Sequence, residues 1–148
     1  MITYQEEAYS KCIDELKLIY PEHYEELSVT KSYELEPNYE SYLKLESSGA
    51  LKVVTCRNDG ELAGYIMYII SPHLHYKSCL TAFEDIYFVR KQYRKGRIGI
   101  KLFQYAEVVL RELKVNRVIY ATKVHSDNSR LFEYLGYTHS DKLYTKLL

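Results

Sequence analysis

The sequence predicts a mixed α/β (α+β) fold in which about six strands form one sheet. Two observations carry this prediction. Residues 51–57 and 61–70 have strand character and flank Asn58-Asp59-Gly60, which is typical of an antiparallel hairpin. Residues 79–122 then read as strand, loop, helix and strand, and a unit of that kind pairs its two strands in parallel. A sheet with both kinds of pairing is mixed.

Two helices are expected ahead of the hairpin. From Tyr4 to about Ile19, apolar residues recur every three or four positions, which indicates an amphipathic helix that ends at Pro21. A second helix is expected over residues 37–48, where proline takes a plausible first position and Ser-Ser-Gly closes the segment. The polar residues 22–36 separate the two helices.

The third predicted strand and the helix after it lie on either side of a basic loop. Residues 71–78 are a polar connection that contains proline, and residues 79–89 read as a largely buried strand, so a second hairpin is implied. Beyond the loop, apolar residues repeat on one helical face over residues 98–113. Residues 115–122 then resume strand character.

The C-terminal part is expected to add a short helix and a last hairpin. Ser126-Asp127-Asn128 supplies helix-start residues, residues 131–135 form the helix, and Gly136 lies where a left-handed cap belongs. Residues 137–148 can supply the hairpin. Because there is no internal repeat or linker, we expect residues 1–148 to form a single domain.

Composition argues against several classes of protein. Lys+Arg and Asp+Glu both number 20, so no net charge attracts a polyanion and no nucleic-acid partner is expected. No apolar run approaches the ~18 residues of a membrane span, and the N-terminus lacks the order of a signal peptide, so we expect a cytoplasmic protein without a membrane partner. Cys12, Cys56 and Cys79 are odd in number and widely spaced, which favours reduced thiols. His73 and His75 lack companion ligands, so no metal is expected.

A basic, glycine-containing loop joins the third strand to the long helix. It reads Arg94-Lys95-Gly96-Arg97-Ile98-Gly99. The first turn of a helix has unpaired N–H groups and about half a positive charge, so a diphosphate can accept from those amides while Arg94, Lys95 and Arg97 neutralise it. Glycine lets the backbone approach closely. The alternative is a basic turn that only caps the helix.

This loop resembles the acetyl-CoA-binding core of the GNAT acetyltransferases, whose signature is (Gln/Arg)-x-x-Gly-x-(Gly/Ala) between a strand and a helix. Residues 128–137, Asn-Ser-Arg-Leu-Phe-Glu-Tyr-Leu-Gly-Tyr, are similar to the family's last motif, in which a short helix follows an asparagine and ends at a glycine beside an aromatic residue. The resemblance covers about residues 81–148 well, and the N-terminal half only in its order of helices and strands.

The resemblance implies a GNAT-like fold with helices on both faces of the sheet and splayed strands at the acetyl-CoA site. It implies that residues 1–148 are an N-acetyltransferase domain that transfers the acetyl group from acetyl-CoA to a primary amine by direct attack in a ternary complex. The thioester and oxyanion contacts are implied on the backbone near Phe88 and Val89. The residues implied to contact the cofactor are Phe88, Val89, Arg94, Lys95, Gly96, Arg97, Ile98, Gly99, Asn128 and Phe132.

Two departures from the family pattern bear on this expectation. The family's central glycine falls on Arg97, with Gly96 displaced by one residue, and an arginine there still presents its N–H to phosphate if its φ is negative. The tyrosine that many members use to protonate the leaving thiolate aligns with Phe132. Tyr134 is the acid expected in its place, with Tyr137 as the alternative. A CoA-binding regulatory or interaction module without catalysis is therefore the alternative function.

Glu84 and Asp85 are the candidate bases. Acyl transfer needs a deprotonated amine, and adjacent strand residues face opposite sides, so we expect only one of the two to serve. Diamine acetyltransferases have a similar Glu-Asp pair before the strand end; counting from that pair favours Glu84, whereas counting back from Val89 favours Asp85. We take Asp85 as the expected base. For either residue the alternative is a carboxylate paired only with backbone or an arginine.

The acceptor is expected to be a small-molecule or protein amine that the sequence does not identify. His73, His75 and Tyr76 lie in the connection before the third strand, where the family admits its acceptor, and are the candidate substrate-binding residues. A surface turn stiffened by Pro72 is the alternative. Assembly as a homodimer is left open. Glutamates near the expected acceptor loops could attract a cationic amine, namely Glu22, Glu25, Glu26, Glu34 and Glu36.

Overall fold

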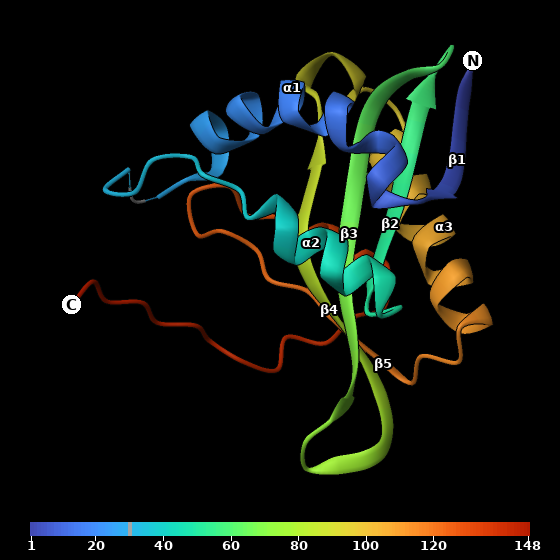
Figure 1. The fold of residues 1–148 in the computed structure, drawn as a ribbon, viewed down its shortest axis with the longest axis vertical. Coiled ribbons are helices and arrows are strands. Elements are labelled where there is room, and N and C mark those ends of the chain that lie inside the picture. The colour runs from blue at the N-terminus through green and yellow to red at the C-terminus, as the bar shows by residue number, and fades with distance from the viewer. Residues whose placement is uncertain (30) are drawn as a thin grey trace.

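Five strands form one sheet at the centre of the computed structural model, which describes residues 1–29 and 31–148 (Figure 1). In spatial order they are β1 (Ile2–Glu7), β2 (Leu51–Asn58), β3 (Glu61–His73), β4 (Tyr76–Val89) and β5 (Arg117–Ile119). Neighbouring strands pair antiparallel except β4 and β5, which pair in parallel. The predicted mixed sheet is therefore confirmed.

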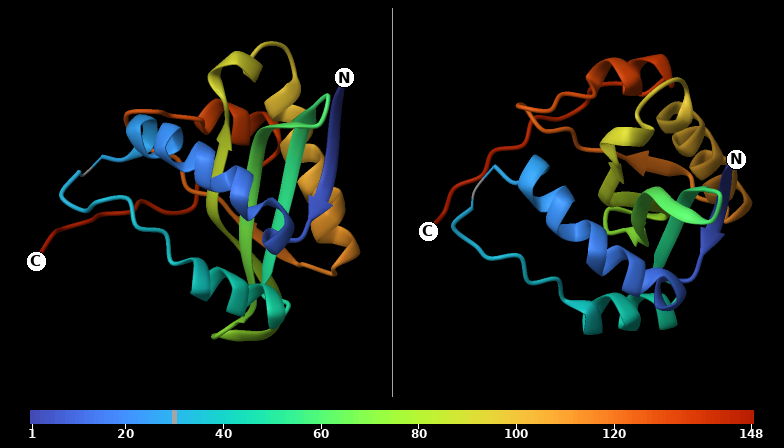
Figure 2. Two further views of the ribbon diagram at one scale, coloured as in Figure 1. Left: turned by 45° about the horizontal axis from the view of Figure 1, so that its top comes forward. Right: turned by 90° about the horizontal axis from the view of Figure 1, so that it is seen from above.

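Helices cover both faces of this sheet, as the resemblance implied. They are α1 (Tyr9–Leu27), α2 (Tyr39–Ser47), the 3-10 turn η1 (Lys91–Tyr93), α3 (Ile98–Glu112) and α4 (Ser129–Tyr134). Seen from above, α1 and α2 lie on one side of the sheet and α3 and α4 on the other (Figure 2). Each face has its own apolar core. Leu16 packs in the core under α1, and Leu102 packs in the core under α3.

The N-terminal segment corrects the helix expected over residues 4–19. Residues 2–7 form the edge strand β1, in which Tyr4 lies opposite Cys56, and α1 begins only at Tyr9. The helical spacing holds from Tyr9 onward. The preceding residues take strand geometry because the edge of β2 offers them ladder partners, and tertiary pairing of this kind overrides local preference.

Pro21 does not end α1, which continues to Leu27. Proline lacks the N–H that would reach back one turn, and this costs the helix a hydrogen bond. The residues just before it, Ile19 and Tyr20, are buried in the core at 4% and 5% exposure, so their packing holds the helix across the proline. The extra turns matter for function because they carry one wall of the cleft described below.

The two hairpins differ in how well they match the sequence. The β2–β3 turn is formed as expected by Asp59 and Gly60, whose φ values of 48° and 89° are those of a type I′ turn. The expected loop over residues 71–78 is instead mostly strand, because β3 runs to His73 and β4 starts at Tyr76. This part of β3 extends beyond β2, so its edge tolerates the prolyl residue that lacks a donor.

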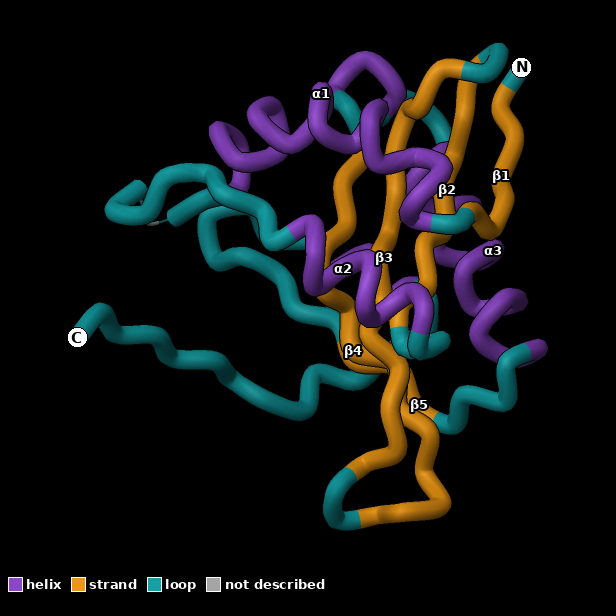
Figure 3. The backbone as a smooth tube through the Cα atoms, viewed as in Figure 1, coloured by secondary structure: helices purple, strands orange, loops and turns teal. Residues whose placement is uncertain are grey.

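The C-terminal residues 137–148 do not form the expected hairpin, so the described residues contain five strands rather than about six. The segment is an extended loop (Figure 3) and exposes Leu143 and Tyr144 at 79% and 90%. A hairpin there would have to pair beside β5. That strand spans only Arg117–Ile119, so it offers a short edge for further pairing.

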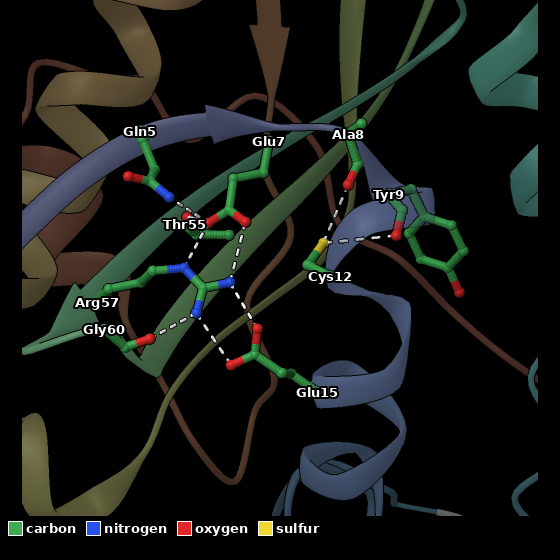
Figure 4. A network of polar contacts seen from close by, with 9 residues as sticks. All are labelled: Gln5, Glu7, Ala8, Tyr9, Cys12, Glu15, Thr55, Arg57 and Gly60. Atoms are coloured by element: carbon green, nitrogen blue, oxygen red, sulfur yellow. Dashed lines mark hydrogen bonds and ion pairs between the residues drawn. The ribbon is translucent and has the colours of Figure 1, made fainter.

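Arg57 of β2 joins three elements by ion pairs (Figure 4). Its guanidinium donates to both carboxylate oxygens of Glu7 in β1, at 2.7 and 2.9 Å, and to both of Glu15 in α1, at 2.9 and 2.8 Å. Burial alone would raise the pKa of Glu7, but hydrogen bonds from Arg57 and Thr55 outweigh it and lower that pKa to about 2. The network fixes the N-terminal half of α1 to the sheet.

Candidate functional site

The sheet opens between β4 and β5. Their pairing involves only residues 81–83 and 117–119, although β4 continues to Val89. Among the described residues, no strand pairs with residues 84–89 on the β5 side. The backbone groups on that side of β4 can therefore receive another extended molecule, and the splayed strands expected at the donor site are present here.

A β-bulge lies at the start of this open edge. Met67 pairs with Ile86 and Tyr68 pairs with Glu84, so Asp85 has no partner residue in β3. A bulge of this kind bends a strand and redirects the side chains beside it. Here it places two carboxylates where the sheet has separated.

A cleft of about 590 Å³ borders the opening. It is lined by the C-terminal half of α1, residues 33–37, Tyr42 of α2, residues 84–87 of β4 and residues between 121 and 128. Tyrosine and carboxylate side chains make up much of this lining. The cleft has the size of a small-molecule site.

Both candidate bases line the cleft, but they have different partners. Asp85 accepts a hydrogen bond from the Tyr42 hydroxyl at 2.5 Å. Glu84 accepts one at 3.1 Å from the N–H of Ala121, which lies just beyond β5. The two side chains diverge, as strand alternation predicts. Because the bulge at Asp85 interrupts the regular ladder with β3, alternation does not exclude either residue from the cleft, and the expectation that only one can serve loses its basis.

The two carboxylates differ in environment. Burial raises the pKa of Glu84 to about 7, the Ala121 N–H opposes that rise, and the negative charge of Asp85 adds to it. A carboxyl group with a pKa near 7 can accept a proton at neutral pH and release it again. Asp85 instead has a fixed donor, because burial and Asp85 itself raise the pKa of Tyr42 and keep that phenol protonated.

His23 is a cleft residue that the sequence analysis missed. It lies on α1, where its ring stacks on Phe88 at 4.6 Å and its Nδ1 is 2.7 Å from the Tyr65 hydroxyl. Burial lowers the pKa of His23 to about 4, so the ring is neutral at physiological pH. Its position three residues after Tyr20 continues the buried stripe of α1, and that spacing was the available signal.

The basic loop ends at the N-terminus of α3. The first helical hydrogen bond runs from the N–H of Lys101 to the carbonyl of Arg97, at 2.9 Å, so the N–H groups of residues 98–100 precede it. A Cβ added at Gly96 or Gly99 would meet nothing within 4 Å, which leaves the approach to those amides open. The loop thus has the geometry of an anion site.

A family model described as "Acetyltransferase (GNAT) family" matches residues 12–137. The chain belongs to the GNAT acetyltransferase family. No curated protein matches it.

Solved GNAT structures share its fold at low sequence identity. The ribosomal-protein-alanine N-acetyltransferase from Brucella melitensis biovar Abortus 2308 has a TM-score of 0.75 at 15% identity, over 100% of this chain and 99% of that one. The glucosamine-6-phosphate N-acetyltransferase from Arabidopsis thaliana has 0.74 at 15%, over 99% and 98%. An aminoglycoside acetyltransferase from an uncultured soil metagenomic sample, in complex with sisomicin, has 0.74 at 13%, over 99% and 94%. Such identities show the fold alone.

The loop departs from the GNAT signature without strain. Gly96 has a φ of 72°, whereas Arg97, at the position of the family's central glycine, has a φ of −110°. The left-handed backbone therefore falls on the displaced glycine, and the arginine keeps a negative φ as the anion site requires. Lys95 and Arg97 are exposed beside the N-terminus of α3 and can meet a diphosphate.

Arg94, the first residue of the GNAT signature, is paired within the protein. Its Nη atoms donate to both carboxylate oxygens of Glu26 in α1, at 2.6 and 2.9 Å, and its Nε donates to the Val89 carbonyl at 2.7 Å. The guanidinium also lies over the Phe88 ring, 5.2 Å from its centroid. Arg94 thus holds the loop against α1 and β4. Its expected role in neutralising phosphate stays a prediction.

The residues near the usual GNAT acid position divide into two groups. Phe132 is buried and stacks on Tyr120, and the exposed Tyr134 hydroxyl accepts a hydrogen bond from Arg97 at 3.1 Å. Neither is among the described residues that line the cleft. Asn128 and Tyr87 do line it, and Asn128 donates to the Tyr87 hydroxyl at 3.1 Å. Tyr87 was missed because strand position alone does not mark it.

The predicted acceptor residues lie elsewhere. His73, His75 and Tyr76 form the tip of the β3–β4 hairpin, at the bottom of Figure 1, where the His75 N–H donates to His73 at 3.1 Å and His73 stacks on Tyr76. Within residues 1–29 and 31–148 the cleft lining does not include them. Tyr76 begins β4, eight residues before Glu84, so strand length separates the tip from the opening. Their role in binding the acceptor stays a prediction from the sequence.

No group of three or more His, Cys, Asp or Glu side chains in the part of the chain that the structure describes could hold a metal ion. No described helix is long and apolar enough to cross a membrane.

Proposed function

We propose that this chain is an N-acetyltransferase that transfers the acetyl group of acetyl-CoA to a primary amine by direct attack in a ternary complex. The acetyltransferase family gives the reaction class. One observation supports the rest: the open edge of β4 leads from the N-terminus of α3 to the two carboxylates of the cleft. A donor on that edge presents its acyl end to the cleft.

Backbone groups hold the donor in this proposal. The first-turn N–H groups of α3 donate to its diphosphate, and Lys95 and Arg97 add charge-assisted contacts. The open edge at residues 84–89 hydrogen-bonds the amides of the pantetheine arm, as it would an added strand. Acetyl-CoA supplies the activated thioester carbonyl. The chain supplies position and charge.

Glu84 is the proposed base, in place of the Asp85 expected from the sequence. An alkylamine with a pKa near that of lysine, about 10.4, arrives protonated, and its proton passes to the Glu84 carboxylate. The neutral nitrogen attacks the thioester carbon; the C–N bond forms, the C–S bond breaks, and sulfur leaves with the electron pair. The nitrogen releases its second proton to water, and water restores the proton that Tyr87 gives to sulfur. N–H groups on the open edge of β4 stabilise the oxyanion.

Tyr87 is the proposed proton donor to the departing sulfur. Burial raises the pKa of its hydroxyl, so the phenol is protonated at neutral pH. The hydroxyl oxygen accepts from Asn128 in the cleft, which leaves its own proton available. Tyr134 is not assigned this role, because its hydroxyl lies against Arg97 outside the cleft lining.

The test combines calorimetry with CoA and a thiol-release assay on a panel of amines. Glu84→Gln is expected to lower turnover about 10²–10⁴-fold with little change in CoA affinity. Asp85→Asn is expected to cost less, because Tyr42 can still donate to the amide oxygen. Glu112→Gln, an exposed carboxylate on α3, is the control. No CoA binding at millimolar concentration would overturn the proposal. Binding without acetylation of any amine would favour the CoA-binding module.

A further inference from the structure

Negative charge predominates in the cleft. Its described lining contains the carboxylates of Glu34, Glu36, Glu84 and Asp85 and one basic side chain, Lys123. The histidine in the lining adds no positive charge at neutral pH, because burial lowers the pKa of His23 to about 4. A concave site with an excess of negative charge concentrates cationic ligands.

The tyrosines of the lining add a second, independent preference. The Lys31 ammonium lies over the ring of the lining residue Tyr24, 5.9 Å from its centroid, and pairs with the Glu25 carboxylate at 2.5 Å. The Tyr24 ring thus already has a primary ammonium on its face. Tyr33 and Tyr42 present further rings in the same lining, and aromatic faces attract cations.

The acidic side chains also differ in depth. Glu84 and Asp85 are half-buried at the opening of the sheet, whereas Glu34 and Glu36 are exposed in the segment before α2. The inner carboxylates lie where acyl transfer would occur. The outer ones can pair only with a part of the acceptor that does not react.

We propose that the acceptor is a small polycationic amine: one amino group enters toward Glu84, and a second stays protonated and binds at the mouth, against Glu34, Glu36 and the tyrosine rings. This rests on the proposed function and names its substrate class. The same charges disfavour acceptors that carry a phosphate or carboxylate away from the reacting amine, because a like charge at the mouth is repelled.

Three acceptors of one chain length test the class: 1,4-diaminobutane, 1-aminobutane and 4-aminobutyrate, whose remote ends are cationic, neutral and anionic. With acetyl-CoA saturating, kcat/KM is expected to fall in that order, with the diamine about three- to thirty-fold above the monoamine at low salt. The margin should shrink at 0.5 M NaCl, where the Debye length is roughly half its physiological value of about 8 Å.

The double variant Glu34→Gln, Glu36→Gln should bring the ratio of diamine to monoamine kcat/KM toward one, whereas Glu112→Gln on α3 should leave it as in the wild type. CoA affinity measured by calorimetry on each variant shows that the protein is folded and the donor site intact. A wild-type preference for 1-aminobutane or 4-aminobutyrate would overturn the substrate class and leave N-acetyl transfer standing. Failure to acetylate any amine, with CoA bound, would instead overturn the proposed function.

Discussion

Replacing Glu84 by glutamine should make the protein more stable at alkaline pH while it loses activity. The pKa of this carboxyl group is about 7 in the folded protein, against an ordinary 4.5. Between those values the folded state binds more protons than the unfolded state, so stability falls as pH rises from about 4.5 through 7. Above pH 7 the ionised, half-buried carboxylate carries the full penalty. Glutamine cannot ionise and avoids it.

The size of the effect follows from the same two values. A difference of about 2.5 between 7 and 4.5 is equivalent to at most about 3 kcal/mol, and the hydrogen bond from Ala121 N–H can be kept by the amide oxygen. We expect Glu84→Gln to gain about 1–3 kcal/mol at pH 8 and close to nothing at pH 4.5. For a chain of this size that corresponds to a rise in Tm of very roughly 2–12 °C.

Urea denaturation and thermal melts at pH 4.5 and pH 8 measure the difference, with Glu112→Gln as the matched control. The wild type's turnover should rise with pH through about 7, as Glu84 ionises, and the variant should lose that titration. Equal stability of variant and wild type at both pH values would show that Glu84 carries no raised pKa. The acid–base argument for it would then fail, whatever the variant's activity.

Three further substitutions test the supporting structure. Glu7→Gln should destabilise the protein by about 1–3 kcal/mol at neutral pH, because it breaks the paired contact with Arg57. The stability that ionised Glu7 contributes is present above about pH 4.5 and lost as pH falls toward 2, and acid denaturation of variant and wild type measures it. Equal stability of the two proteins at neutral pH would show that the pair contributes no more than an exposed surface pair. Glu26→Gln should release Arg94 toward the diphosphate and tighten CoA binding about two- to five-fold by calorimetry, and weaker binding would mean that the pair holds the loop in its binding shape. Gly99→Glu should abolish the rise in Tm that CoA produces. In the wild type that rise reflects a stabilisation free energy of about 2.7 kcal/mol at a hundredfold excess over Kd. An unchanged shift would place the diphosphate elsewhere.

Local signals in the sequence predicted the parts of the fold that depend on neighbouring residues. Asp59 and Gly60 marked a turn that only a few residue types adopt, and the turn is there with both φ values positive. The strand–loop–helix–strand unit led to the parallel pair β4 and β5, because a helical crossover of that length is the usual connection between parallel strands. Gly136 takes the left-handed cap for the same local reason.

Elements whose stability comes from distant partners could not be read in the same way. β1 exists because β2, about fifty residues away, offers an edge, as the pairing of Tyr4 with Cys56 shows. The expected hairpin at residues 137–148 would have needed such an edge beside β5, and the edge is short. Pro21 looked like a stop in sequence, whereas burial of the residues before it carries the helix onward.

The candidate site likewise has parts that depend on neighbouring residues and parts that depend on distant ones. The motif located the loop at residues 94–99, because backbone geometry there depends on glycine position within a few residues. The cleft side chains come from five separate segments, and no sequence motif marks His23 or Tyr87 as a cleft residue. The bulge at Asp85 appears only when β3 and β4 are paired, so counting along the chain could not decide between the two carboxylates.

Two ion pairs join α1 to the segment that leads into the basic loop, and they hold this loop beside the cleft. Arg90 pairs with Glu22 at 3.2 Å, and Arg94 pairs with Glu26 through two contacts. The two arginines are four residues apart in the chain, and the two glutamates are four apart on α1. The two ion pairs therefore fix the direction in which α1 crosses the loop. The same turns of α1 carry His23 to the cleft. If the diphosphate of acetyl-CoA draws Arg94 away from Glu26, the charge beside His23 changes. Acetyl-CoA binding should then change the affinity for the acceptor, and acceptor binding should change the affinity for acetyl-CoA by the same factor.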